Sequence, residues 1–537
     1  MLTAEFHPFS VVPGLSRLFL DYCSSAAAAR PFYASLPADG HWQRRPPVPA
    51  HWPQLVELLA EQNATSSPAA LAALDALRGG AGVMVTGQQV GLFGGPLFTP
   101  FKAATALARA RQATAAGTPH AAIFWLATED HDFAEINHVV FPARRELRTL
   151  TYANAPDAAR PVGGIVLDDS ITPLVEQAGE LLGASDAMDA LAAAWQPGHT
   201  LAEAFRQFYA KAFAAQGLLV LDAAGRAWHR MGAPVLGAAL ERADELHEAL
   251  VDRNRKLEES GYHAQVAVEP QSSLLFLIDE RTGARLALKR QPASAQEPAG
   301  LWQAGRQSLT TDDLLGILDS EPERISPGAL LRPVFQDFLL SSSAIIGGPA
   351  EVAYYAQSAV LYERILGRVT PALARFSATL VEPAVAKLLS QHELTLEQVF
   401  GEPAAALAQR LAFKAIPEEG KQKLAAAGTA LEAELAPLVD WMRALDGGLG
   451  RSAETAASKM RYQMSRLRRL AANFQLQREA QLGRHAEAIS QAIYPGGGLQ
   501  ERLHGAAYYF ARYGFELAEE ITAQAAEPRP GHTAMWL

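Results

Sequence analysis

Four short apolar segments, separated by helical sequence, constrain the fold of this chain more than any other feature. They lie at residues 82–86, 121–127, 217–222 and 344–347. Short apolar strands that alternate with helices form parallel sheets covered by helices on both faces. Ligands bind such sheets beyond the carboxyl ends of the strands. The sequence therefore predicts an α/β fold, and polar residues that directly follow a strand become candidates for a functional site.

The regions around these strands differ in their sequence patterns. Residues 1–80 are predicted to be a helical lead-in that packs on a sheet domain spanning 81–382, with helices near 54–61 and 69–78. Within the sheet domain, the stretches near 143–170 and 262–292 alternate like short exposed strands. We predict that these two stretches are insertions that form flaps over the site.

A long helical segment occupies residues 383–492. Apolar residues recur there in the alternating four-three spacing of a coiled-coil seam: Leu424, Leu431, Leu435, Leu438, Met442, Leu445 and Leu449, then Met460, Met464, Leu467, Ala471 and Phe474. The glycine-rich residues 446–450 interrupt the pattern. The segment is predicted to be an antiparallel helical hairpin with a structural role, because its seam carries no catalytic cluster.

Composition excludes several classes of protein. A chain of 537 residues with 49% hydrophobic residues is long enough for several domains, and its net charge of -10 argues against nucleic acid as a partner. The first residues lack the pattern of a signal peptide, and no stretch approaches the ~18 apolar residues of a membrane span. Cys23 is the only cysteine, which excludes internal disulfides and zinc sites with several thiolates. We therefore expect a cytoplasmic protein without zinc.

The glycine-rich stretch after the first strand is the first candidate site. Its candidates for binding a nucleotide or phosphate are Thr86, Gly87, Gln88, Gln89, Gly91, Gly94 and Gly95. Glycines allow backbone N–H groups to approach an anion, and the N-terminus of the following helix adds favourable potential. The stretch matches neither the Walker A motif nor the dinucleotide fingerprint. The alternative is a tight strand-to-helix crossing that needs glycine only for packing.

Acidic residues and a histidine follow the second strand. The catalytic candidates are Glu129, Asp130, His131 and Asp132, flanked by Trp125 and Asn137 as candidates for binding substrate. Such a group of carboxylates is unfavourable unless it is solvated, protonated or engaged with a cation or amine. It predicts an ammonium site, a Mg²⁺ site for a nucleotide, or a general base provided by His131 or Glu129. The alternative is a charged helix N-terminus, where acidic residues suit the helix dipole.

A third cluster surrounds the fourth strand. Its candidates for binding substrate are Arg332, Gln336, Asp337, Gly347, Gly348, Glu351 and Tyr354. The guanidinium of Arg332 suits a carboxylate or phosphate, and Glu351 and Tyr354 are expected on the first turns of a helix that faces the ligand. The alternative is a buried salt bridge between Arg332 and Asp337.

Five segments in these regions resemble the BshC family, the cysteine-adding enzymes of bacillithiol biosynthesis. They are Thr-Gly-Gln-Gln-Val-Gly-Leu-Phe-Gly-Gly-Pro-Leu at 86–97, Trp-Leu-Ala-Thr-Glu-Asp-His-Asp-Phe-Ala-Glu-Ile at 125–136, Leu-Arg-Pro-Val-Phe-Gln-Asp at 331–337, Gly-Gly-Pro-Ala-Glu-Val-Ala-Tyr at 347–354 and Tyr-Pro-Gly-Gly-Gly-Leu-Gln-Glu-Arg at 494–502. The resemblance implies a Rossmann-type core related to class I nucleotidyl transferases, with connecting insertions, an antiparallel coiled-coil arm and a homodimer. It also implies that residues 493–537 return to the core.

The activity implied by the resemblance is a ligase reaction that forms an amide. The carboxyl group of cysteine would be joined to the amine of glucosaminyl-malate, with ATP and Mg²⁺ as the natural means of activation. Under this hypothesis the glycine-rich loop contacts the phosphates, and Glu129, Asp130 and Asp132 hold the cysteine ammonium or Mg²⁺. His131 accepts a proton from the attacking amine, and Arg332 binds a carboxylate. The sequence lacks the His-Ile-Gly-His and Lys-Met-Ser-Lys-Ser motifs of class I synthetases, which leaves ATP dependence open.

Two other functions remain compatible with the sequence. One is a nucleotide-binding assembly or regulatory module whose coiled-coil arm recruits a partner. The group of acidic residues with His131 argues against it, because passive binding needs no groups for proton transfer. The other is a nucleotidyl transferase that acts on a different amine.

Overall fold

The computed structural model describes residues 3–65, 67–143, 146–291, 301–527 and 529–537. Positions 1–2, 66, 144–145 and 292, which fall within the predicted lead-in and insertions, lie outside the described residues. The chain divides into two compact units. Unit 1 consists of Met1–Ala143, Leu147–Ala378 and Glu501–Thr533, and unit 2 consists of Arg144–Glu146, Thr379–Gln500 and Ala534–Leu537.

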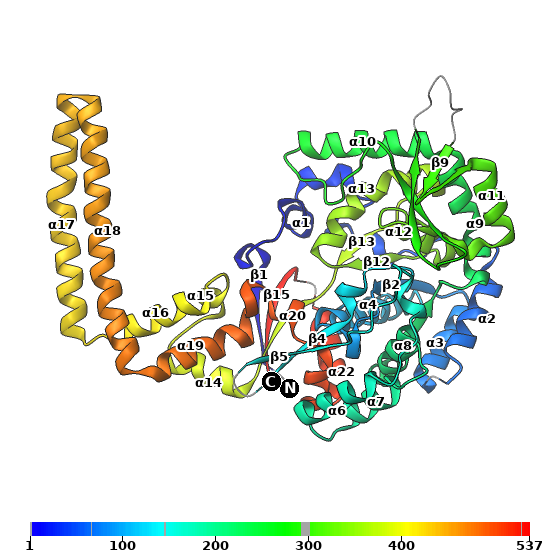
Figure 1. Cartoon of the computed structure of the whole chain (residues 1–537), viewed down its shortest axis with the longest axis horizontal. Coiled ribbons are helices and arrows are strands. Elements are labelled where there is room, and N and C mark those ends of the chain that lie inside the picture. Colours follow the sequence, from blue (N-terminus) through cyan, green and yellow to red (C-terminus); the bar gives the residue numbers. More distant parts are fainter. Residues whose placement is uncertain (1–2, 66, 144–145, 292–300, 528) are drawn as a thin grey trace. The chain divides into compact units, whose positions relative to one another are not determined.

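A five-stranded parallel sheet forms the centre of unit 1 (Figure 1). Its strand order is β13 (Ala372–Ala374), β12 (Ala344–Gly347), β2 (Gly82–Gln88), β3 (His120–Leu126) and β6 (Leu219–Asp222). The predicted parallel α/β sheet is confirmed with all four predicted strands. Strand β13 was not predicted, because three residues give too short an apolar run to recognise.

Helices from both the lead-in and the crossovers pack on this sheet. Helix α4 (Phe98–Ala115) lies along β2, β3 and β12, while α2 (Trp52–Gln62) and α3 (Pro68–Arg78) contact β6 and β3. The other helices that follow the lead-in are α5 (Phe133–Ile136), α6 (Ile171–Leu182), α7 (Asp186–Ala194), α8 (Leu201–Ala212), α9 (Arg226–Glu241), α10 (Ala243–Glu259), α11 (Thr311–Ser320), α12 (Arg332–Leu340) and α13 (Pro349–Leu366). Most of α4 is buried, which explains its weakly amphipathic, alanine-rich sequence.

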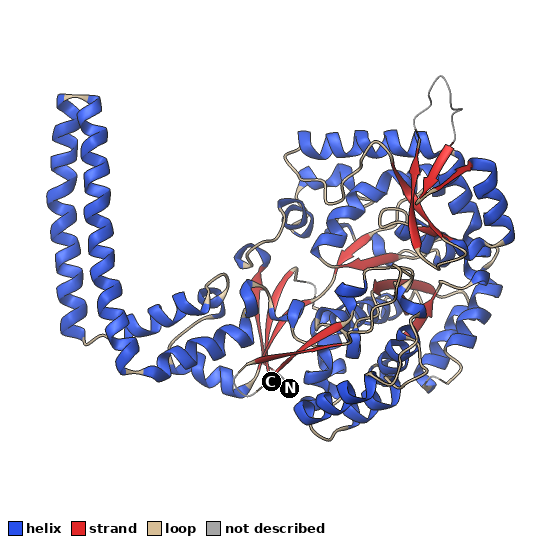
Figure 2. Cartoon of the chain, in the orientation of Figure 1, coloured by secondary structure: helices blue, strands red, loops and turns tan. Residues whose placement is uncertain are grey.

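The two stretches predicted to be insertions form antiparallel sheets, separate from the parallel sheet (Figure 2). The first contributes β5 (Leu147–Thr151), which forms a hairpin with β4 (His138–Pro142), a strand that begins before the predicted stretch. The second has the order β10 (Gln307–Thr310), β9 (Leu301–Ala304), β8 (Arg285–Arg290), β7 (Ser272–Ile278) and β11 (Ile325–Pro327). This sheet extends well past residue 292, the predicted end of the insertion. Its later strands were not predicted, because they are too short to identify from alternation.

Remaining elements flank these sheets or belong to unit 2. They include β1 (Thr3–Pro8), α1 (Arg17–Cys23), β14 (Ser377–Val381), α14 (Pro383–Gln391), α15 (Leu396–Val399), α16 (Ala404–Lys414), α19 (Ala480–Ile493), α20 (Gln500–Leu503), α21 (Ala506–Tyr513), α22 (Glu516–Ala525) and β15 (Gly531–Trp536). None of the helices in the described part of the chain is long and apolar enough to cross a membrane.

The predicted helical hairpin is present in unit 2 as α17 (Glu418–Leu445) and α18 (Gly447–Arg478) (Figure 1). Only Asp446 separates the two helices. Its carboxylate accepts hydrogen bonds from the N–H groups of Gly448 (2.8 Å) and Leu449 (2.9 Å). The break is therefore tighter than the glycine content of 446–450 suggested, because a capping aspartate begins the second helix directly.

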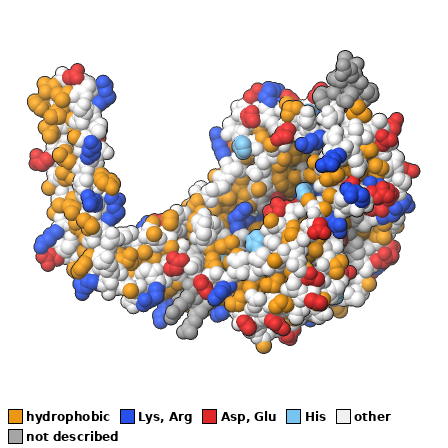
Figure 3. All heavy atoms as spheres, viewed as in Figure 1, with side chains coloured by type: hydrophobic (Ala, Val, Ile, Leu, Met, Phe, Trp, Pro, Cys, Tyr) orange, Lys and Arg blue, Asp and Glu red, His pale blue; other side chains and the backbone are white. Residues whose placement is uncertain are grey.

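The buried stripe of the hairpin differs from the predicted seam. Leu435, Val439 and Ala457 form its core, with Leu431 and Ala453 packed beside them. Several residues of the predicted seam are exposed instead, namely Leu438, Leu445, Leu449, Met460, Leu467 and Phe474. Two helices bury only the stripe at which they face each other, so a wider apolar surface stays uncovered in a lone hairpin. Figure 3 shows hydrophobic side chains gathered along it.

Candidate functional site

A cavity of about 450 Å³ lies in unit 1 at the carboxyl ends of the parallel strands. Four strands contribute the residues that directly follow them: Gln88 and Gln89 from the end of β2, Glu129 to His131 after β3, Gly348 after β12 and Arg375 after β13. The second antiparallel sheet adds Phe276 and Arg285. The cavity is therefore where the topology of an open α/β sheet predicts a ligand.

Carboxylates gather on the side of the cavity next to β3. The side-chain amide of Gln89 donates to Asp130 Oδ2 (2.6 Å) and to Glu135 Oε2 (2.8 Å). Asp130 Oδ1 also accepts from the backbone N–H of His131 (2.7 Å). Burial alone would raise the pKa of Asp130, but these hydrogen bonds lower it overall. Asp130 is therefore ionised at neutral pH and makes this side anionic.

Arg285 holds the imidazole of His131. Its guanidinium donates to Ser326 Oγ (3.0 Å) and to the carbonyl of Pro327 (2.9 Å), and its Nη1 lies 3.2 Å from His131 Nδ1. The guanidinium also lies over the ring of Phe276, 3.8 Å from its centroid. These contacts fix both the position and the orientation of His131.

A buried histidine contacts Glu129. His229 Nε2 lies 2.9 Å from Glu129 Oε1, and the His229 side chain is 0% exposed. His229 Nδ1 contacts the backbone carbonyl of Ile325 at 3.0 Å. Glu129 lines the cavity, so this pair connects the cavity to an imidazole that solvent cannot reach.

The side of the cavity next to β12 carries a buried lysine. Lys102 on α4 is 3% exposed, and its ammonium contacts Glu351 Oε2 (2.5 Å), the carbonyl of Gly87 (2.9 Å) and Gln88 Oε1 (2.7 Å). Burial lowers the pKa of Lys102, and Glu351 partly opposes this effect. Glu351 also accepts from the N–H of Gly348 (2.8 Å) at the start of α13. The ion pair joins α4 to the first turn of α13.

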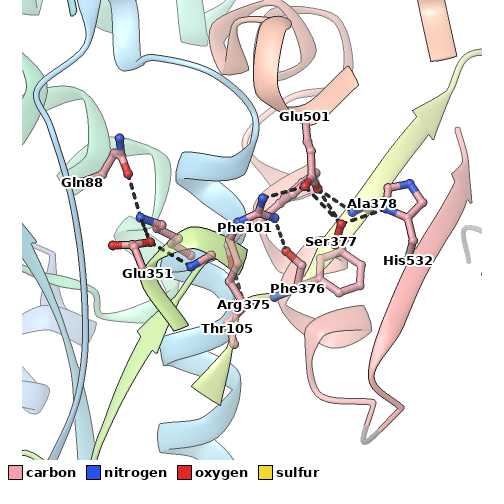
Figure 4. Close-up of polar contacts among 12 residues, drawn as sticks. Gln88, Phe101, Thr105, Glu351, Arg375, Phe376, Ser377, Ala378, Glu501 and His532 are labelled. Atoms are coloured by element: carbon pink, nitrogen blue, oxygen red, sulfur yellow. Dashed lines mark hydrogen bonds and ion pairs between the residues drawn. The ribbon is translucent and has the colours of Figure 1, made fainter. Parts of the chain in front are cut away.

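Arg375, next to β13, belongs to a buried network (Figure 4). Its guanidinium donates to Glu501 Oε1 (2.6 Å) and to the carbonyl of Phe376 (2.8 Å). Ser377 Oγ lies 3.0 Å from Glu501 Oε2 and 2.8 Å from His532 Nδ1. Arg502, which follows Glu501, is exposed and lines the cavity. Residues far apart in the sequence thus build the cationic side together.

Arg332 also lies on the cationic side of the cavity, and its side-chain partners are uncharged. It donates to the hydroxyl of Tyr354 (2.8 Å) and lies 3.5 Å from Gln336 Oε1. Among the described residues, no carboxylate lies within ion-pair distance of Arg332. Asp337 pairs with Arg368 instead (2.5 Å), so the expected alternative of a bridge from Arg332 to Asp337 is not formed. Burial raises the pKa of Asp337 to about 6 despite Arg368.

Comparison with known proteins decides the family. Residues 6–376 match the family model described as "Bacillithiol biosynthesis BshC, N-terminal Rossmann-like domain". Residues 378–536 match the model described as "Bacillithiol biosynthesis BshC, C-terminal coiled-coil domain". The chain belongs to the BshC family. The resemblance seen in the sequence is confirmed, as are the Rossmann-like core and the coiled-coil region.

Curated BshC proteins align along nearly the whole chain. One from Koribacter versatilis, named "Putative cysteine ligase BshC", is 42% identical over 533 residues, which covers 98% of each chain. Proteins of the same name from Solibacter usitatus and Salinibacter ruber are 35% and 30% identical. These alignments cover 82% and 94% of this chain and 81% and 93% of the relatives.

In this BshC chain, the cavity brings together residues from all three predicted clusters. Those that line it are Gly87, Gln88, Gln89, Trp125, Glu129, Asp130, His131, Arg332, Gly348, Glu351 and Tyr354. Other predicted residues lie outside its lining: Thr86, Gly91, Gly94, Gly95, Asp132, Asn137, Gln336, Asp337 and Gly347. Asp132 caps α5 by accepting from the N–H of Glu135 (3.2 Å), and Asn137 donates to the carbonyl of Tyr152 (3.1 Å).

The glycines at 91, 94 and 95 pack within their own loop and do not line the cavity. The N–H groups of Gly91, Gly94 and Gly95 donate to carbonyls within the loop, at 3.0, 3.2 and 3.0 Å. A Cβ atom on Gly94, whose φ is +88°, would lie 2.9 Å from the ring of Phe208. The side chain of Thr86 donates to the carbonyl of Ile346 (3.1 Å). For these positions the arrangement favours the alternative of a tight crossing that needs glycine for packing.

Several residues of the site were not recognised in the sequence. They are Lys102, His229, Arg285, Arg375, Glu501 and Arg502. Glu501 and Arg502 lie inside the segment 494–502 on which the resemblance rests, so a signal was present for them. Lys102 is the only lysine in α4 and follows a strand and loop, which is a weaker signal. His229 and Arg285 stand in ordinary helical and strand patterns.

The described residues contain no group of three or more His, Cys, Asp or Glu side chains that is arranged to hold a metal ion. The carboxylates next to β3 are instead engaged by Gln89, His229 and Arg285.

Proposed function

We propose that this protein is a ligase of bacillithiol biosynthesis, which joins the carboxyl group of cysteine to the amine of glucosaminyl-malate. Membership of the BshC family and the printed name of its relatives support a cysteine ligase. The observation that carries the choice of substrates is the charge of the cavity. One side is anionic and the other is cationic, and each substrate carries groups of both signs.

The order of the strands separates the two sides. The acidic residues follow β3, whereas Arg375 follows β13 and Lys102 pairs with Glu351 beyond the end of β12. Neighbouring strands lie about 4.8 Å apart, so β3 and β12, with β2 between them, are about 10 Å apart. That separation suits a substrate with an amine at one end and carboxylates at the other.

The cationic side supplies two guanidinium groups for an anionic ligand. The charges of Lys102 and Arg375 are already paired with Glu351 and Glu501. Arg332 and Arg502 have no ion pair with any carboxylate of the described chain. Guanidinium groups bind carboxylates through charge-assisted hydrogen bonds. We assign the malate part of the acceptor to Arg332 and Arg502, and its amine to the side of Glu129.

Amide formation near neutral pH requires activation of the cysteine carboxylate, because a carboxylate is a poor electrophile. Mg-ATP as co-substrate supplies an adenylyl or phosphoryl group that turns one carboxylate oxygen into a leaving group. The amine nitrogen then attacks the carbonyl carbon, the bond to that oxygen breaks, and a proton leaves the nitrogen. The residues of the cavity hold the two substrates at one point and receive the proton.

Oxygen labelling tests this reaction. Purified protein is mixed with Mg-ATP, glucosaminyl-malate and cysteine that carries ¹⁸O in both carboxyl oxygens. Mass spectrometry should find bacillithiol with one ¹⁸O and a second ¹⁸O on AMP or on phosphate, which also identifies the activating group. Product that forms without ATP, or without transfer of ¹⁸O to a nucleotide product or phosphate, would contradict activation by ATP.

We also propose that the protein is a cytoplasmic homodimer formed through the hairpin of α17 and α18. Trp441 (58% exposed) and Leu445 (59% exposed) lie on α17, and Met460, Leu467 and Phe474 are exposed on α18. A coiled-coil hairpin with so wide an apolar surface is stabilised when another helical surface covers it. A second copy of the chain supplies such a surface.

Calorimetry separates this enzyme from a nucleotide-binding module with a partner-recruiting arm. For the enzyme, saturation with glucosaminyl-malate should change the affinity for cysteine, because both substrates occupy one cavity. A module would bind nucleotide with an affinity that glucosaminyl-malate leaves unchanged.

A further inference from the structure

The polar contacts of His229 determine where its protons lie. The carbonyl of Ile325 can only accept, so His229 Nδ1, 3.0 Å away, carries a proton and donates it. The other ring nitrogen, Nε2, lies 2.9 Å from Glu129 Oε1. A contact this short between two lone pairs would be repulsive, so one of the two atoms must carry a proton, although the angle at Nε2 does not make the contact a well-formed hydrogen bond. The pair is therefore an imidazolium beside a carboxylate, or a neutral imidazole beside a carboxylic acid.

The surroundings favour the imidazolium and the carboxylate. Burial alone would lower the pKa of His229, but Glu129 raises it above its usual value. Two other charged groups act on Glu129: Arg285 on β8 as a cation, and Asp222 at the end of β6 as an acid whose pKa is raised by burial. Arg285 adds to the stabilisation of an ionised Glu129. The imidazolium is thus the nearest of these counter-charges to Glu129.

The same reasoning makes His131 a poor proton acceptor. A guanidinium can only donate, so His131 Nδ1, 3.2 Å from Arg285 Nη1, is placed to accept, and Asp130 Oδ1 lies farther from it, at 3.7 Å. A ring that accepts at Nδ1 carries a proton on Nε2. His131 can donate a hydrogen bond from Nε2, but its only free lone pair faces a cation.

We propose that Glu129 is the general base that accepts the proton of the attacking amine, and that His229 is a positioning residue that keeps Glu129 ionised and oriented. The inference rests on the proposed ligase reaction and deepens it. It replaces His131 as the proton acceptor and leaves that residue as a hydrogen-bond donor to developing negative charge, a role that suits a neutral imidazole with a fixed tautomer.

The proton balance of the step is simple. The amine nitrogen forms its bond to the activated carbonyl carbon, and the activated oxygen leaves with its electron pair. One proton passes from the nitrogen to Glu129, whose second oxygen is not engaged by His229. Glu129 becomes a carboxylic acid and stays in contact with the imidazolium of His229. The proton returns to solvent when the product leaves.

Nitrogen NMR of histidine tests the pair without any need for activity. The protein is labelled with ¹⁵N-histidine, and the signals of His229 are assigned by their loss in His229→Gln. At pH 7 both ring nitrogens of His229 should be protonated in the wild-type protein. In Glu129→Gln, Nε2 should lose its proton while Nδ1 keeps it. A neutral His229 in the wild type, or a spectrum unchanged by Glu129→Gln, would overturn the inference.

The pH dependence of the rate tests the role. His229→Gln removes the nearest counter-charge of the carboxylate, so the acidic limb of kcat/KM should move to higher pH by about 1 unit or more. Glu129→Gln should lose about 10²- to 10⁴-fold in kcat at all pH values. The matched control is His199→Gln, since half-buried His199 also bonds a backbone carbonyl but lies outside the cavity.

The outcomes are distinguishable. If His229→Gln lowers the rate equally at every pH, His229 is only structural and the inference is wrong. A variant that does not fold is recognised by its thermal melt, and the NMR comparison with Glu129→Gln then decides alone. If NMR shows the charged pair but the wild type forms no amide from any of the substrates, the proposed ligase function is wrong and not the pair.

Discussion

Arg375 and Glu501 form a buried ion pair in unit 1, with 2.6 Å between Nη2 and Oε1, although they lie 126 residues apart in the sequence. Both side chains are almost fully buried, at 3% and 1% exposure. Glu501 also accepts from the N–H of Ala378 (2.9 Å). The position of a cation at the cavity thus depends on the chain that follows the helical arm.

The first prediction concerns this pair. Glu501→Ala should lower the free energy of unfolding by about 3–5 kcal/mol, because it leaves the buried guanidinium without its counter-charge. The matched control is Glu519→Ala, which removes an exposed pair with Arg111 (2.7 Å) and should cost no more than about 1 kcal/mol. Urea denaturation measures both. Equal losses in the two variants would show that the pair contributes no more than a surface contact.

The second prediction concerns the loss of folding stability at acidic pH. Burial lowers the pKa of His532 to about 4 in the folded protein. The unfolded chain has an ordinary histidine near 6.5 and binds its proton first. The contribution of His532 to stability is therefore complete above about pH 6.5 and is lost as the pH falls towards 4, about 3 kcal/mol in all.

Denaturation between pH 7 and pH 4 measures this effect. His532→Asn should flatten the loss of stability across that range, whereas substitution of the exposed His138 by Gln should leave the wild-type dependence intact. An identical pH dependence in His532→Asn and wild type would show that another group is responsible.

The third prediction concerns Arg332. Arg332→Ala should raise KM for glucosaminyl-malate by about 10- to 100-fold, because it removes charge-assisted hydrogen bonds worth about 1.5–3 kcal/mol. Glucosamine lacks the malate carboxylates, so the variant and the wild type should use it equally poorly. Arg226→Ala, which affects an exposed pair with Glu323, is the control. The same penalty with both acceptors would place the malate elsewhere.

The fourth prediction concerns the hairpin. The double substitution of Trp441 and Leu445 by Glu should convert a dimer into a monomer, because charges would replace the most exposed apolar side chains of α17. Light scattering after gel filtration measures the mass. Leu71→Glu places a charge at an exposed leucine of α3 and should leave the dimer intact. A wild-type protein that is monomeric at micromolar concentration would contradict the proposed interface.

Sequence patterns were sufficient for the parts of the fold that depend on local periodicity. The runs that became β2, β3, β6 and β12 are apolar over four or more residues, and their helices lie where the spacing places them. The topology then predicts that Gln89, Glu129 and Gly348 approach one cavity, because residues that follow parallel strands meet at one edge of the sheet. The acidic residues after β3 were found for this reason.

The contacts that turn this cavity into a reactive site depend on chain distant in sequence. His229 reaches Glu129 from a helix about 100 residues later, and nothing in the pattern of α9 marks it as more than a core histidine. The glycines 91, 94 and 95 have the composition of an anion-binding loop, but their N–H groups bond within the loop. Only three-dimensional packing separates these two uses of glycine.

Formation of bacillithiol by the purified protein tests the central claim most directly. Cysteine, glucosaminyl-malate and Mg-ATP are mixed with wild type or Glu129→Gln, and the product is measured by mass spectrometry beside mixtures that each lack one substrate. We predict product only when all three substrates are present, with a loss of at least about 100-fold in the variant. No product from the folded wild type, or equal product from Glu129→Gln, would contradict a ligase reaction carried out by this cavity.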